Sequence, residues 1–208
     1  MEGFSALSDS ELIMLCAATA ERAAPFCRIL GTEEQRAWLE SGLELAWRMA
    51  AGEDAADDCS AMLDWLEVED DEEEFEDADP TAHPGFYADQ AVGLVGESLA
   101  SSLMPSGDRV ETALKTVRTL FSMVDFKLSG EKPVIVRSGE ERPPPGPLVQ
   151  RELDAAGAAL GLLSRRSGGA GQQPDALSAL VELRNSAREF AAAVTPSLEE
   201  FAEANDWK

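Results

Sequence analysis

The chain has 208 residues, 44% of them hydrophobic and 27% charged, which is the balance of a globular protein that can bury its own core. Its formal net charge of −23 argues against direct binding to nucleic acid or to an anionic membrane, because contacts to phosphate need clustered Lys and Arg. Ala and Leu are abundant while Ile, Thr and Tyr are few, so the composition favours helices over strands.

A capping box predicts the start of the first helix. Ser8 and Glu11 have the required spacing, and apolar residues follow on one side of the expected helix. Pro25 has no backbone N–H to donate, so we expect it to kink or break this helix near residue 24. Gly31 is a suitable residue to end it.

The next two helices follow directly. Thr32 and Gln35 form a second capping box, which opens a helix that runs through Met49. A third helix is expected over residues 55–66, where apolar side chains recur at spacings of three and four. Both helices therefore have one face to bury against the rest of the fold.

Two further helices lie beyond an acidic stretch. Pro84 suits a first helical turn, and one apolar stripe follows it from residue 88 to Leu103. Asp108 with Glu111 has the spacing of another N-terminal cap. The helix that follows, over residues 110–128, has the most regular apolar face in the chain.

Regularity is lost over residues 130–147, a Pro-rich connection in which three consecutive prolines impose extended backbone. The run VIV within it has strand-forming residues but no evident partner strand. Helices are expected again over residues 148–164 and 174–194, with a Gly-rich linker at 167–174 between them. Pro196 is expected to begin a short final helix.

These elements predict one all-α domain that spans residues 1–208, a single helical bundle of about seven or eight helices. The N-terminus lacks a basic, apolar leader, and every apolar run is interrupted by charge, which argues against a membrane span. Three cysteines, Cys16, Cys27 and Cys59, lie on expected apolar faces, so we expect free thiols in a reducing cytoplasm.

Several stretches resemble a known family. The stretch AATAERAAPFCRIL carries Glu21, Arg22 and Pro25, and LESGLELAW ends in Trp47. Two later stretches are ALKTVRTLFSMVDFKL and GPLVQRELDAAGAALGLLS, the second with Pro147, Leu148, Arg151 and Glu152. Over roughly residues 10–165 the chain resembles the YjaG-like family of small, all-helical bacterial proteins without an established activity. The resemblance implies an all-α fold and a cytoplasmic location, and it brings no catalytic residues.

The most unusual feature is an acidic loop at residues 67–83. No Lys or Arg occurs between Arg48 and Arg109, yet this interval holds 18 of the 40 carboxylates. Three interpretations stay open: a solvated loop that confers solubility, a docking surface for a basic protein, or a metal site. The loop has neither the D-x-D-x-D-G order nor the internal Gly of a calcium loop, so no dedicated metal site is expected.

As a docking surface, this stretch would combine charge with aromatic anchors. Carboxylates would steer the approach of a basic protein, and rings would supply buried area. The candidate partner-binding residues are Asp70, Asp71, Glu72, Glu73, Glu74, Phe75, Glu76, Asp77, Asp79, Phe86 and Tyr87.

No catalytic signature accompanies these residues. His83 is the sole histidine, which excludes a multi-histidine zinc site, and there is no GxSxG nucleophile motif. We therefore expect no catalytic residue and no cofactor. Arg22 is expected to pair with an acidic residue and to cap carbonyls that Pro25 frees, while Trp38, Trp47 and Trp65 are expected to pack in or beside the core.

The leading hypothesis is a non-enzymatic module that binds a basic protein. Its most concrete form is an immunity or antitoxin protein that blocks a cationic toxin, since toxins that act on nucleic acid must be basic. One alternative is a regulatory or structural helical protein that self-associates as a homo-oligomer through an apolar groove, with the acidic loop serving solubility. A third is an enzyme that uses carboxylates and a divalent ion.

Overall fold

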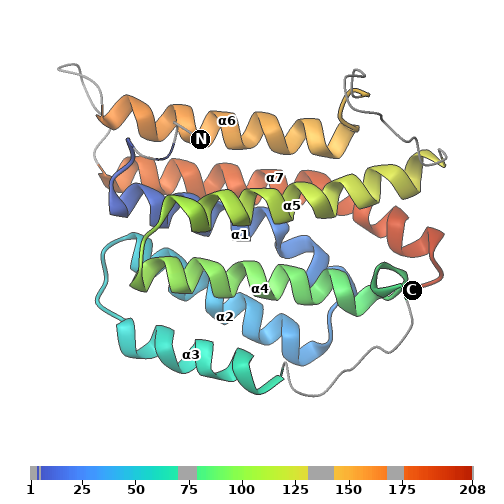
Figure 1. Cartoon of the computed structure of the whole chain (residues 1–208), viewed down its shortest axis with the longest axis horizontal. Helices are drawn as coiled ribbons and strands as arrows, with labels where there is room; N and C mark the ends of the chain where they lie inside the picture. The colour runs from blue at the N-terminus through green and yellow to red at the C-terminus, as the bar shows by residue number, and fades with distance from the viewer. Residues whose placement is uncertain (1–3, 5, 70–78, 131–142, 168–175, 208) are drawn as a thin grey trace.

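The computed structural model describes residues 4, 6–69, 79–130, 143–167 and 176–207. Within these residues the protein is all-α, with seven α-helices, one short 3-10 helix and no strand, which confirms the predicted fold class (Figure 1). The elements are α1 (Asp9–Leu30), α2 (Glu33–Ala50), α3 (Ala56–Glu69), η1 (Pro80–Ala82), α4 (Pro84–Leu103), α5 (Gly107–Ser129), α6 (Pro147–Ser167) and α7 (Ala176–Ala204).

Helix α1 is the centre of the bundle. It packs against α2, α4, α5, α6 and α7, and its side chains are buried from Met14 to Cys27 without interruption. A helix buried on all sides needs small residues where its neighbours approach closely, and the alanines of α1 supply them. Helices α3 and α6 lie at opposite edges of the molecule (Figure 1).

Both predicted capping boxes are confirmed. The backbone N–H of Ser8 donates to Glu11 Oε2 at 2.8 Å. The backbone N–H of Gln35 donates to Thr32 Oγ1 at 3.2 Å, and that of Thr32 donates back to Gln35 Oε1 at 2.9 Å. These pairs satisfy backbone donors that a helix N-terminus leaves free, so they set where α1 and α2 begin.

The structure shows neither the break that was one expected outcome at Pro25 nor the separate helix expected at Pro196. Helix α1 continues through Pro25 to Leu30, and α7 continues through Pro196 to Ala204, so there is no break and no separate final helix. Figure 1 shows α7 changing direction towards its C-terminal end. A proline costs a helix one hydrogen bond, and burial of the turns on both sides offsets that cost.

Some predicted boundaries and faces also differ. The N-cap of α5 is Ser106, whose Oγ accepts from the N–H of Asp108 at 3.2 Å, so α5 begins before the predicted cap at Asp108. Leu103, predicted to close the apolar stripe of α4, is exposed at the end of that helix. The predicted VIV run and most of the Gly-rich linker lie outside the described residues.

Helix α6 takes its N-terminal cap from another helix. Asp125 of α5 accepts hydrogen bonds from the N–H groups of Leu148 and Val149, each at 3.0 Å. A carboxylate at a helix N-terminus satisfies free donors and interacts favourably with the helix dipole. The α5–α6 pair is therefore joined at the point where the chain returns from its Pro-rich connection.

Two helical glycines give a matched test of close packing. A Cβ added at Gly42 of α2 would lie 2.6 Å from Val95 Cγ1 of α4, whereas one added at Gly93 would meet nothing within 4 Å. We expect Gly93→Ala to raise the free energy of unfolding by about 0.5–1 kcal/mol, through backbone entropy. We expect Gly42→Ala to lower the free energy of unfolding by roughly 0.5–2 kcal/mol, because the cost of overpacking against Val95 is larger than the gain from backbone entropy. Urea denaturation measures both, and equal effects of the two changes would contradict close α2–α4 contact.

Candidate functional site

The residues predicted to bind a partner are spread over different environments. Residues 70–77, which include the predicted anchor Phe75, lie outside the described residues. Asp79 is exposed and is the N-cap of η1, and Phe86 is half-buried in the first turn of α4. Among the predicted residues that the structure describes, only Asp79 and Phe86 therefore have exposed surface.

Tyr87 is a core residue, which corrects its prediction as an exposed anchor. Its ring is fully buried and packs on Phe26, Phe201 and Trp207, with ring centroids 5.2–6.1 Å apart. The phenol donates a hydrogen bond to the carbonyl of Thr81 at 3.1 Å. Burial raises the pKa of this phenol above its ordinary value, so it stays a neutral donor.

The C-terminal end of the acidic loop is attached to the fold. Asp79 Oδ1 accepts from the backbone N–H of Thr81 at 3.0 Å and from its hydroxyl at 2.7 Å. These hydrogen bonds hold the pKa of Asp79 below its usual range, so the carboxylate is charged at neutral pH. Together with the bond from Tyr87 to Thr81, they attach η1 to the core.

The described carboxylates on the other side of the acidic loop belong to α3. We call Asp57, Asp58 and Asp64 the α3 acidic edge; all three are exposed. Asp58 is 4.0 Å from Arg48, which also pairs with Glu53, and neither Asp57 nor Asp64 appears in an ion pair of the described residues. The edge therefore keeps most of its negative charge.

The opposite face of α3 is fixed to the bundle. Trp65 stacks on Trp38 of α2, with ring centroids 5.5 Å apart, which agrees with the prediction that these rings pack beside the core. Leu66 lies against Gly96 of α4, where an added Cβ would come within 2.6 Å of it. The acidic edge is thus presented by a helix that is anchored along its apolar side.

A second candidate site is a buried ion pair between α1 and α6. Arg22 donates from Nε to Glu152 at 2.7 Å and from Nη2 at 3.0 Å, and the two side chains are 2% and 0% exposed. Arg22 Nη2 also lies 3.2 Å from the hydroxyl of Thr19. The predicted acidic partner is confirmed, but the other partner of Arg22 is Thr19 and not a carbonyl freed by Pro25.

Glu21 forms the centre of a neighbouring polar cluster. Its carboxylate is buried and accepts from Trp47 Nε1 at 3.0 Å and from Arg28 at 3.3 Å, and Arg188 Nε of α7 is 3.7 Å away. Arg184, also from α7, stacks over the ring of Trp47. Nothing in the sequence indicated the two arginines of α7, because no local pattern relates them to α1.

The described side chains offer little for nucleophilic or metal chemistry. Burial raises the pKa of the Cys16 and Cys27 thiols to about 11, so both are protonated and poorly nucleophilic at neutral pH. All three cysteines are free and buried, as predicted. Within the described part of the chain, no group of three or more His, Cys, Asp or Glu residues is placed to hold a metal ion.

Comparisons with known proteins add no assignment to this geometry. No family model, no curated protein and no solved structure matches the chain, so its resemblance to the YjaG-like family stays a prediction. Among the described helices, none is both long enough and apolar enough to cross a membrane.

Proposed function

We propose that this protein is a non-enzymatic binding module that engages a basic protein through its acidic loop and the α3 acidic edge. The observation that carries the proposal is the uncompensated charge of α3, on a helix anchored along its other face. Neutralisation of a cationic toxin is the most concrete biological form of this activity. A toxin that acts on nucleic acid must itself be basic.

The interval between Arg48 and Arg109 holds 18 of the chain's 40 carboxylates and no Lys or Arg, and this concentration supports a partner over simple solubility. Elsewhere on the described surface some carboxylates have a nearby cation, as Glu40 has Arg28, Glu97 has Arg109 and Glu111 has Lys115, while others such as Glu182 and Glu189 are dispersed among them without an ion pair of the described residues. A protein that needed charge only for solubility would gain as much from carboxylates dispersed among such pairs. Concentrating unpaired carboxylates in one place adds repulsion, which the approach of a basic partner relieves.

Three baits of the intact protein test this proposal in a pull-down from the native cell lysate. They are the native chain, Asp57→Asn with Asp64→Asn, and a control of equal net charge, Glu200→Gln with Glu203→Gln on α7. We expect the native bait to capture a basic protein at low salt and to release it at high salt. The α3 variant should bind this protein roughly 2- to 30-fold more weakly, while the α7 control should bind it as the native chain does. Equal losses with both variants would show an effect of net charge and would contradict a site at α3.

A further inference from the structure

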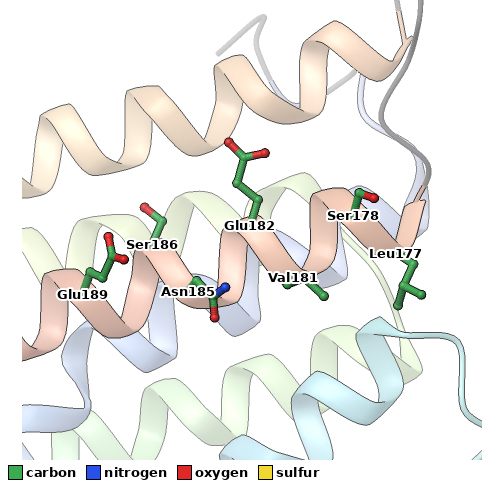
Figure 2. A pocket seen from close by; sticks show the side chains of 7 residues that line it. All are labelled: Leu177, Ser178, Val181, Glu182, Asn185, Ser186 and Glu189. Carbon is green, nitrogen blue, oxygen red and sulfur yellow. The ribbon is translucent and has the colours of Figure 1, made fainter.

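The N-terminal half of α7 has an outer face that no other described element covers. Leu177 and Val181 lie one helical turn apart on it and are 65% and 50% exposed. They line a hollow of about 710 Å³ together with Ser178, Glu182, Asn185, Ser186 and Glu189 (Figure 2). Most large apolar side chains in the described ranges are buried, so an exposed pair at the spacing of one turn is a candidate contact surface.

The polar part of this lining is acidic. Glu182 and Glu189 are exposed, and neither takes part in an ion pair of the described residues. The nearest arginines along α7 are already engaged: Arg184 pairs with Glu44, and Arg188 lies 3.7 Å from Glu21. Figure 2 shows the two apolar side chains on one side of the helix and Glu182 projecting from the other. The face thus combines an apolar edge with a negative edge.

This combination selects among occupants. A second copy of the chain would place two carboxylates from each copy at one interface, and such a concentration of like charge is costly. A partner with apolar residues one turn apart and Lys or Arg beside them would match both edges. The face from Leu177 to Glu189 is about 18 Å long at 1.5 Å per residue, which fits about three turns of a bound helix.

We infer that this α7 face docks an amphipathic, basic helix of the partner, with apolar side chains on Leu177 and Val181 and cations at Glu182 and Glu189. The inference rests on the proposed function, because it takes the partner to be basic. It adds a second contact surface at which apolar burial, and not charge alone, supplies affinity.

Two synthetic peptides of equal length and charge test this docking site. One is an amphipathic helix of Leu and Lys, and in the other every Leu is replaced by Ser. Fluorescence anisotropy measures their affinity for the native chain, for Leu177→Asn with Val181→Asn, and for a control pair, Leu103→Asn with Met104→Asn. All four positions are exposed, so the fold should be retained, and circular dichroism checks this.

We expect the α7 variant to bind the Leu/Lys peptide about 5- to 30-fold more weakly, with no change for the Lys/Ser peptide or in the control variant. Equal binding of the Leu/Lys peptide by native and α7-variant proteins would overturn the inference. A native dimer in sedimentation that the α7 variant abolishes would also overturn it, because the occupant would then be a second copy. A different result would contradict the proposed function itself: unchanged binding of the Lys/Ser peptide by the variant Asp57→Asn with Asp64→Asn.

Discussion

Arg22→Met is expected to lower the free energy of unfolding by about 3–5 kcal/mol, because it leaves the Glu152 carboxylate buried without its partner. The pair is bidentate, with distances of 2.7 and 3.0 Å, and the Glu152 side chain has no exposed surface. Removing one member of such a pair costs far more than breaking an exposed ion pair, which is worth about 0.2–1 kcal/mol. Urea denaturation followed by circular dichroism measures the loss.

The double variant Arg22→Met with Glu152→Leu separates two explanations of that loss. If the cost comes from an unpaired buried charge, replacing both members by apolar residues of similar size should recover most of it. If it comes from lost packing between α1 and α6, the double variant should be at least as unstable as the single one. The surface pair Glu111 and Lys115, in which Glu111 is half-buried and Lys115 is exposed, is a suitable control, and Lys115→Met should change stability by less than about 1 kcal/mol.

Tyr87→Ala is expected to destabilise the protein by about 3–5 kcal/mol, which is the cost typical of truncating a buried aromatic side chain. The Tyr87 ring contacts the rings of Phe26, Phe86, Phe201 and Trp207, so it joins α1, α4 and the C-terminal end of α7. Tyr87→Phe keeps the ring and removes only the hydrogen bond to the Thr81 carbonyl, so it should cost about 1 kcal/mol.

Hydrogen exchange distinguishes the two roles of Tyr87. In Tyr87→Phe, we expect faster exchange confined to the backbone amides around Thr81, since η1 loses one of its attachments to the core. In Tyr87→Ala, faster exchange should extend into α1 and α7. Unchanged exchange around Thr81 in Tyr87→Phe would contradict a role for the phenol in holding the C-terminal end of the acidic loop.

The helices themselves follow from local signals in the sequence. The capping boxes at Ser8 and Thr32 act within one turn, so the same residues that identify them also satisfy the donors at the start of α1 and α2. The apolar face of α5, including Val117 and Phe121, was evident because its period repeats over about five turns. The position of α3 was predicted to within a few residues for the same reason.

The candidate site was only partly predictable. The absence of cations between Arg48 and Arg109 is visible in the sequence, and it identifies the acidic region without any structure. Which carboxylates remain unpaired depends on tertiary distances, as the contact between Asp58 and Arg48 illustrates. Tyr87 was assigned to the surface because it follows the acidic loop, although it lies four residues before Ala91 on the apolar stripe of α4. That spacing was the available signal for its burial.

By itself, the sequence determined the helical class, most helix boundaries, the core faces of the cysteines and the strong local concentration of negative charge. Tertiary structure alone decided that Arg22 meets Glu152, 130 residues away, and that Asp125 caps α6. It also decided that Pro25 and Pro196 lie within continuous helices. The physical reason is one of range: caps and periodic faces act over one or two turns, whereas the partner of a buried charge is set by which helices pack together.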